Sequence, residues 1–287
     1  MLISPKLATE AALQGKPVTE HSTEHSIDYK SLTDGLRAIA QSAATVIMSH
    51  YVTEIVVDHK DDNSPVTIAD KQGEEIILAG LQKLAPQIPI VSEEAASEGH
   101  IPDFGDRFFL VDPLDGTREF INKNGEFTVN IALIENGVPT AGVVYAPAIG
   151  RMFFAQGPSQ AFEQKLPNGE AGEAPIAIKV RTPDEDGLTV VASRSHRDER
   201  TDEYLNHYKI KNFVAAGSSL KFCLVAAGDA DLYPRHGRTM EWDTAAGHAV
   251  LAAAGGSVTQ LDGTPFLYGK SERGLDNPFF VAKGGVA

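Results

Sequence analysis

Short apolar segments of this chain run straight into acidic residues, and this feature restricts its possible folds more than any other. Strands are predicted over 88–91 and 107–111 and a helix over 242–254, with acids at the end of each strand and at the start of the helix. Such positions meet along one edge of a sheet in α/β proteins. Because converging carboxylates repel one another, they stay ionised only if a cation shares their site. These acids are Glu93, Asp112, Asp115 and Asp243.

The pattern of the first half predicts two helices and an antiparallel sheet. Apolar residues three and four positions apart predict an amphipathic helix over 27–51, and a second helix is predicted over 64–84. Asn136-Gly137 between two apolar runs predicts a tight turn between antiparallel strands. In the second half strands alternate with helices, which predicts a mixed sheet and, for the whole chain, a mixed α/β (α+β) fold class. These later elements are strands over 188–192 and 231–234 and helices over 198–208, 218–227 and 242–254.

Three regions are expected along the chain. Residues 1–26 are polar and predict a flexible N-terminal extension. A stretch over 156–175 that is rich in glycine, proline and charge predicts a boundary. We place an N-terminal α+β subdomain with most of the metal ligands at 27–165. A C-terminal α/β subdomain at 166–287 is expected to complete the metal site and to bind the substrate.

Composition restricts the partners and the location. The formal net charge of −14 excludes general binding of nucleic-acid polymers, which needs a basic surface. A small anion can still bind where metal ions supply positive charge. No apolar run reaches the roughly 18 residues of a membrane span, and residues 1–25 lack the pattern of a secretory signal. The single cysteine, Cys223, fits a reducing cytoplasm. We expect a cytoplasmic monomer, with an oligomer and a peripheral position at the inner membrane left open.

The segment VDPLDGT at 111–117 carries the strongest chemical information. Its acids stand three apart, a proline stiffens the turn between them, and the Leu114 carbonyl can also face an ion. Haloacid-dehalogenase phosphatases space their two aspartates two apart, so Asp112 is not expected to be a phosphorylated nucleophile. Each acid alone is also typical of a turn, a helix cap or a surface ion pair. Together they predict a site for a hard cation such as Mg²⁺, which prefers oxygen ligands.

Three segments resemble the signatures of the inositol monophosphatase superfamily. These segments, which occur in the family's order, are SEE at 92–94, VDPLDGT at 111–117 and WDTAAG at 242–247. The resemblance covers the chain from about residue 30 to its end. Five further segments resemble the bacterial CysQ-type 3'(2'),5'-bisphosphate nucleotidases within this superfamily. These are DNSPVT at 62–67, REFI at 118–121, NGEFTVN at 124–130, SRSH at 193–196 and GSSLKF at 217–222.

The resemblance implies a fold and a set of residue roles. The implied fold is a layered α/β/α/β/α sandwich of two packed subdomains. Thr117 and Asp70 are implied to activate water. The implied ligands of two or three Mg²⁺ ions are Glu93, Asp112, the Leu114 carbonyl, Asp115 and Asp243. The implied substrate contacts are Gly116, Thr117, His196, Ser218, Lys221, Arg235 and Asp243. Ser218 and Lys221 are three apart on a predicted helix, so they are expected to share one face.

The resemblance also implies a reaction. In this reaction the 3'-phosphate of adenosine 3',5'-bisphosphate (PAP) is removed to give AMP. The sulfated nucleotide PAPS is a further candidate substrate. The resemblance also implies a link to sulfate assimilation and inhibition by lithium. The alternative substrate is inositol monophosphate or a sugar bisphosphate, and the alternative class is a non-catalytic nucleotide- or metal-binding protein. Lys221 with Arg235 favours a substrate with a second phosphate. The acids with Thr117 favour an enzyme, because a binding protein needs no pair of groups that activates water.

Overall fold

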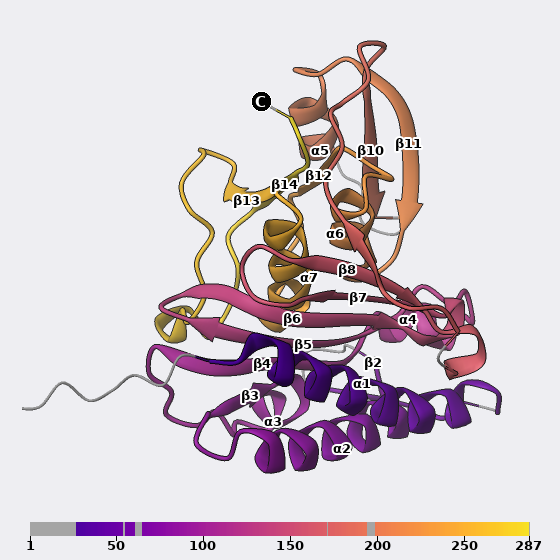
Figure 1. Cartoon of the computed structure of the whole chain (residues 1–287), viewed down its shortest axis with the longest axis vertical. Coiled ribbons are helices and arrows are strands. Elements are labelled where there is room, and N and C mark those ends of the chain that lie inside the picture. The colour runs from indigo at the N-terminus through magenta and orange to yellow at the C-terminus, as the bar shows by residue number, and fades with distance from the viewer. Residues whose placement is uncertain (1–26, 54, 61–64, 171, 194–198, 287) are drawn as a thin grey trace, which may run out of the picture.

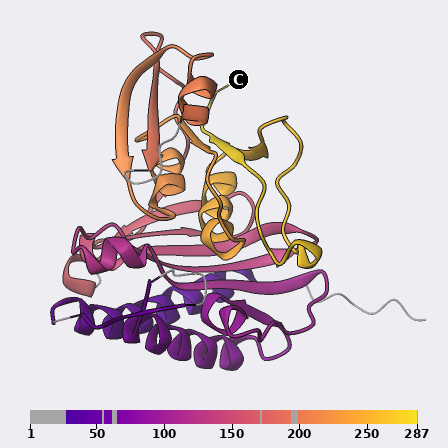
Figure 2. The same cartoon turned by 180° about the vertical axis from the view of Figure 1, so that it is seen from behind.

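The computed structural model of the chain describes residues 27–53, 55–60, 65–170, 172–193 and 199–286. In this part of the chain helices and sheets alternate in five layers, as the front and back views show (Figure 1, Figure 2). The predicted α/β/α/β/α sandwich is therefore confirmed. The predicted extension over 1–26 and His196 lie outside the described residues. None of the described helices combines the length and the apolar surface needed to cross a lipid bilayer.

The first layer consists of α1 (Tyr29–Tyr51) and α2 (Ile68–Leu84), which each carry one apolar face. In α1 the buried residues recur at helical spacing, as predicted, and both helices pack side by side on one face of the large sheet (Figure 1). The members of this α1 stripe are Leu32, Leu36, Ala40, Ala43 and Ile47.

The second layer is a sheet with the order β3-β4-β5-β6-β7-β8-β9 in the described residues. The β3–β4 pair is parallel and the other neighbours are antiparallel. Asn136 and Gly137 join β5 to β6 with φ angles of 53° and 76°, as a two-residue turn between twisted strands requires. Short helices follow β3 and β4 directly. The elements are β3 (Ile90–Ser92), α3 (Glu93–Ser97), β4 (Arg107–Asp115), α4 (Thr117–Ile121), β5 (Thr128–Glu135), β6 (Val138–Ala146), β7 (Arg151–Ala155), β8 (Ala161–Lys165) and β9 (Ile176–Ile178).

The third layer, α6 (Leu220–Ala226) and α7 (Trp242–Ala253), lies between the two sheets (Figure 1). The alanine-rich sequence of α7 has a packing reason, because this helix is buried on almost every side. A Cβ on Gly142 of β6 would stand only 3.1 Å from the Cβ of Ala249 and 3.2 Å from the Cα of Ala246. The helix that begins with Trp242-Asp243 is thus held directly against the sheet that carries the other acids.

The fourth layer is a mixed sheet, as predicted, with the order β11-β10-β12-β14-β13 in the described residues. β10 pairs in parallel with β11 and β12, whereas β14 pairs antiparallel with β12 and β13. The fifth layer is α5 (Glu199–Leu205), whose Leu205 joins an apolar cluster with Val190 and Leu232. The strands are β10 (Leu188–Ser193), β11 (Ile210–Ala216), β12 (Leu232–Arg235), β13 (Ser257–Gln260) and β14 (Phe280–Lys283).

The start of α2 and the extent of the large sheet differ from the sequence expectation. The helix predicted from residue 64 begins at Ile68, because β2 (Pro65–Thr67) pairs with β1 (Val57–His59). Thr67 caps this helix, since its Oγ1 accepts a hydrogen bond from the backbone N–H of Ala69 at 3.2 Å. The large sheet also continues past residue 165, because β9 pairs with β8. The division into subdomains between residues 165 and 166 stays a prediction.

Candidate active site

Strand register places Glu93 beside Asp112. β3 and β4 run parallel with Ser92 opposite Val111. Glu93, the first residue of α3, follows Ser92 just as Asp112 follows Val111 in β4, and the charge of Glu93 acts on Asp112. The pairing of β4 with β5 is then interrupted between Asp112 and Asp115. Such an irregularity bends a strand and redirects its side chains. The acids predicted from two strand ends thus meet at one edge of the sheet.

These acids act on one another electrostatically. Asp112 is 1 % exposed, and its pKa lies well above the ordinary value, first because of burial and then because of the charges of Glu93, Asp115 and Asp243. Burial, followed by the charges of Asp115 and Glu93, also raises the pKa of Asp243. A buried group of carboxylates is stable in the ionised form only with positive charge among them. An all-oxygen set of this kind fits Mg²⁺.

Positive charge reaches Glu93 from a lysine. The Nζ atom of Lys60 lies 2.7 Å from Glu93 Oε1 and 2.8 Å from Glu94 Oε1. Burial alone would lower the pKa of Lys60, but the two carboxylates outweigh it and raise the pKa. Within the described residues, no three acidic, histidine or cysteine side chains are spaced as the ligands of one metal ion. The acids therefore share one electrostatic environment.

Ser219 connects Asp115 to the start of α7. The Oδ2 atom of Asp115 accepts a hydrogen bond from the Ser219 backbone N–H at 2.6 Å and lies 3.0 Å from Ser219 Oγ. Ser219 Oγ also lies 2.7 Å from the Asp243 carbonyl oxygen, so its single hydrogen serves one of these acceptors at a time. Asp243 Oδ2 accepts from Met240 N at 2.8 Å. Hydrogen bonds from the described residues thus reach Oδ2 of both acids, which leaves Oδ1 of each for a cation.

Asp70 and Thr117, which are distant in sequence, are in contact. Thr117 Oγ1 donates a hydrogen bond to Asp70 Oδ1 at 3.0 Å. The other oxygen, Oδ2, accepts from both the backbone N–H and the Oγ1 of Thr67 at 2.7 Å, which completes a capping box at the start of α2. Burial raises the pKa of Asp70 despite these hydrogen bonds. One carboxylate therefore has both the structural role of a cap and the contact expected of a water-activating pair.

Two buried carboxylates that the sequence analysis missed hold the acid-bearing segments in place. Glu74 of α2 accepts hydrogen bonds from the backbone N–H groups of Glu94 and Ala95 at 2.9 and 3.0 Å, which fixes the start of α3. Glu241, next to Trp242-Asp243, is 0 % exposed and accepts from the N–H groups of Gly269 and Lys270 at 2.7 and 2.9 Å. No local sequence pattern separates such acids from solvated ones, because their partners are backbone groups distant in sequence.

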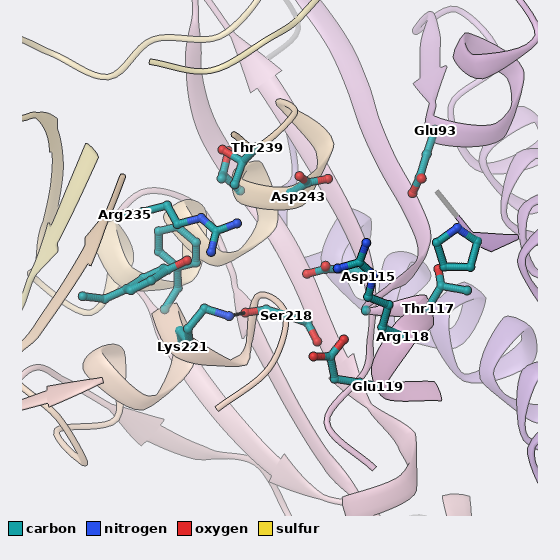
Figure 3. A pocket seen from close by; sticks show the side chains of 15 residues that line it. Glu93, Asp115, Thr117, Arg118, Glu119, Ser218, Lys221, Arg235, Thr239 and Asp243 are labelled. Carbon is teal, nitrogen blue, oxygen red and sulfur yellow. Dashed lines mark hydrogen bonds between the residues drawn. The ribbon is translucent and has the colours of Figure 1, made fainter. Parts of the chain in front are cut away.

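A pocket of about 300 Å³ lies in front of the acids (Figure 3). Eight residues from the sequence analysis line it: Glu93, Asp115, Gly116, Thr117, Ser218, Lys221, Arg235 and Asp243. Asp70, Asp112 and Leu114 do not line it and are buried, with at most 2 % exposure. Seven lining residues were not assigned to the site: Pro65, Arg118, Glu119, Phe222, Tyr233, Thr239 and Thr244. For Arg118 and Glu119 the REFI segment at 118–121 was an available signal.

Lys221 and Arg235 bring positive charge to the side of the pocket away from Glu93 (Figure 3). Lys221 is 4 % exposed, and its Nζ donates a hydrogen bond to the Ser218 carbonyl oxygen at 2.6 Å. Burial lowers the pKa of Lys221 to about 8. The expected shared helix face is wrong, because α6 begins at Leu220 and Ser218 lies in the preceding turn with a φ of 45°. Both residues still reach the pocket.

The raised pKa values predict a pH dependence of stability. Asp112 and Asp243 ionise at a higher pH in the folded chain than their ordinary value of 3.8. Above that value the folded state holds more protons than the unfolded state, so the free energy of unfolding falls as the pH rises toward the folded-state pKa values. In EDTA, we expect the melting temperature to fall as the pH rises from about 3.8 toward these folded-state pKa values. The fall should be less steep in Asp112→Asn. Added Mg²⁺ should offset the fall. Equal slopes for wild type and Asp112→Asn in thermal unfolding would contradict this.

Comparisons with known proteins identify the class to which this fold and site belong. The inositol monophosphatase family matches residues 28–280, so the chain belongs to this family, as the resemblance predicted. Membership of the family implies dependence on Mg²⁺. The 3'(2'),5'-bisphosphate nucleotidase CysQ of Shigella flexneri is 46 % identical over 253 residues, which cover 88 % of this chain and 99 % of that protein. The crystal structure of CysQ from Bacteroides thetaiotaomicron has a TM-score of 0.75 at 36 % identity, covering 91 % of this chain and 99 % of that one. An inositol monophosphatase of Thermotoga maritima has a TM-score of 0.69 at 25 % identity, covering 86 % and 90 %.

Proposed function

We propose that the chain is a Mg²⁺-dependent 3'(2'),5'-bisphosphate nucleotidase that hydrolyses adenosine 3',5'-bisphosphate to AMP and phosphate. The observation that carries this proposal is the position of Lys221 and Arg235, in the same pocket as the acids but on the side away from Glu93 (Figure 3). A substrate whose reacting phosphate lies at the acids meets these cations best with a second phosphate. The names of the CysQ relatives support the same reaction. Hydrolysis of PAPS and a link to sulfate assimilation are parts of this proposal.

The acids are proposed to hold the ions. When bound, Mg²⁺ neutralises phosphate oxygens, lowers the pKa of water and stabilises a leaving alkoxide. The protein contributes by fixing its ligands, since Ser219 orients Asp115 and the Met240 N–H orients Asp243. The proposed ligands of two or three ions are Glu93, Asp112, the Leu114 carbonyl, Asp115 and Asp243.

Thr117 and Asp70 are proposed to move the proton of the attacking water. Because Thr117 Oγ1 gives its own hydrogen to Asp70 Oδ1, a lone pair of the Thr117 oxygen is left to accept a proton from water in the pocket. Asp70 then takes the threonine proton. Burial raises the pKa of Asp70, and a carboxylate with a pKa closer to the working pH is a better proton acceptor.

Two of the alternatives fit the pocket less well. Inositol monophosphate offers no second phosphate to Lys221 and Arg235. A non-catalytic binding protein does not require the contact between Thr117 and Asp70. The monomeric state, the cytoplasmic location, the number of ions and the sensitivity to lithium stay predictions.

The second phosphate can be tested with two substrates. Lys221→Ala and Arg235→Ala should each lower kcat/KM for adenosine 3',5'-bisphosphate by about tenfold or more, the scale of a lost charge-assisted hydrogen bond. For adenosine 3'-monophosphate the same changes should matter much less, because this substrate has no 5'-phosphate to lose. Steady-state phosphate release with both nucleotides measures the difference.

Lys83→Ala is the matched control, because this exposed lysine of α2 lies outside the pocket. It should leave kcat/KM unchanged for both nucleotides. Equal losses on the bisphosphate and the monophosphate in Lys221→Ala and Arg235→Ala would mean that these residues support the reacting phosphate or the fold. The assignment of a bisphosphate substrate would then lose its structural support.

A further inference from the structure

An acidic side chain lies in the pocket where the proposed substrate is anionic. Glu119 belongs to α4, two residues after Thr117, and lines the pocket. Within the described part of the chain, no hydrogen bond or ion pair reaches its carboxylate. Figure 3 shows the carboxylate on the same side of the pocket as Ser218. Because a carboxylate repels phosphate, its position here indicates that it binds another part of the substrate.

Two glycines define where this carboxylate stands. A Cβ on Gly217 would lie 2.9 Å from Glu119 Cγ, so the side chain packs directly on the Gly217 backbone. A Cβ on Gly116 would lie 3.2 Å from Glu119 Oε2 and 2.9 Å from Ser218 Oγ. Gly116 directly precedes Thr117, beside which the reacting phosphate is proposed to bind. The carboxylate therefore faces the part of the substrate next to that phosphate.

The proposed substrate has one neutral donor in that region. In adenosine 3',5'-bisphosphate, the 2'-hydroxyl stands on the carbon next to the one that bears the 3'-phosphate. The adenine amino group lies at the far end of the nucleoside, and fully ionised phosphates have no hydrogen to donate. A hydroxyl that donates to a carboxylate makes a short, charge-assisted hydrogen bond, which is stronger than one between neutral groups.

We propose that Glu119 accepts a hydrogen bond from the ribose hydroxyl next to the reacting phosphate and thereby selects ribonucleotides over deoxyribonucleotides. This inference rests on the proposed function and deepens it. The hydroxyl is the 2'-OH when a 3'-phosphate reacts and the 3'-OH when a 2'-phosphate reacts. Because these two oxygens are cis neighbours on the ribose ring, one carboxylate can serve both isomers.

A competing role for Glu119 is to keep Lys221 charged. The negative charges of Asp115, Glu119 and Glu126 oppose the effect of burial on the pKa of Lys221. Such a role would act through the 5'-phosphate, which ribonucleotide and deoxyribonucleotide bisphosphates share. Removal of the 2'-hydroxyl therefore separates the two roles.

The test compares adenosine 3',5'-bisphosphate with 2'-deoxyadenosine 3',5'-bisphosphate at saturating Mg²⁺. Glu119→Ala should lower kcat/KM about tenfold for the ribonucleotide and less than about twofold for the deoxyribonucleotide, as expected for one hydrogen bond to a charged group. Glu119→Gln keeps the shape and an acceptor oxygen, so it should lose less than Glu119→Ala. Glu272→Gln removes the same charge from an exposed turn outside the pocket and should change neither value.

Each outcome decides between the roles. Equal losses on the two nucleotides in Glu119→Ala would overturn the inference in favour of a role through Lys221 or through packing on Gly217. Equal kcat/KM for the two nucleotides in the wild type would overturn it as well. Both results leave the proposed function standing, because the bisphosphates are hydrolysed. If the wild type released phosphate from another monoester but from neither of these nucleotides, the proposed function and this inference would both be overturned.

Discussion

Asp112→Asn is expected to lower kcat by at least about a thousandfold, because loss of a charge from the proposed metal ligands removes several kcal/mol of stabilisation from the transition state. The fold should survive the change. Asp112 is buried among like charges that raise its pKa, so a neutral side chain of the same shape relieves repulsion. In EDTA the melting temperature of Asp112→Asn at neutral pH should therefore lie above that of the wild type.

Asp112→Asn should also reduce the stabilisation of the folded state by Mg²⁺, because an ion that binds more weakly stabilises the fold less at a given concentration. Calorimetric titration with MgCl₂ and melting curves over a range of Mg²⁺ concentrations measure this without any turnover. Asp103→Asn, at an exposed position before β4, is the matched control and should leave kcat and the Mg²⁺ response unchanged. Near-normal kcat for Asp112→Asn at saturating Mg²⁺ would remove Asp112 from the proposed ligands.

The sequence was informative where local chemistry dictates structure. Asn136-Gly137 has few alternatives to a tight hairpin turn, and β5 and β6 pair around it as predicted. Apolar strands that run into acids led to Glu93 and Asp112, and the register of β3 with β4 brings these residues to the same edge. These inferences needed only neighbouring residues and the general geometry of sheets.

The sequence was uninformative where a residue's role depends on partners distant along the chain. Glu74 and Glu241 resemble solvated acids, yet both are buried and accept backbone hydrogen bonds from other elements. The helix predicted over 64–84 included Pro65, but pairing with β1 makes this residue part of a strand. The REFI segment at 118–121 was the only signal for Glu119, because its position in the pocket depends on contact with Gly217, which is distant in the sequence. Tertiary contacts, rather than local propensity, decide each of these cases.

The contact between Thr117 and Asp70 permits a second test with a large effect. Thr117→Val removes the hydroxyl but keeps the branched shape, and it should lower kcat by about a hundredfold or more, the usual contribution of a positioned acid–base group. Asp70→Asn should have an effect of similar size, because the amide cannot take the threonine proton. Thr117→Ser keeps the hydroxyl and should retain most of the activity. Steady-state kinetics at saturating Mg²⁺ provide the comparison.

Asp70 also completes the capping box of α2, so loss of activity in Asp70→Asn could come from loss of the cap. Thr67→Ala separates the two roles. It removes the hydroxyl that accepts from Ala69 N and donates to Asp70 Oδ2, but leaves the hydrogen bond from Thr117 to Asp70 Oδ1 in place. A lost N-cap costs about 1 kcal/mol of stability, so Thr67→Ala should lower the melting temperature by a few degrees while kcat changes little. If Thr67→Ala lowered kcat as much as Thr117→Val does, the cap rather than proton transfer would explain the role of Asp70.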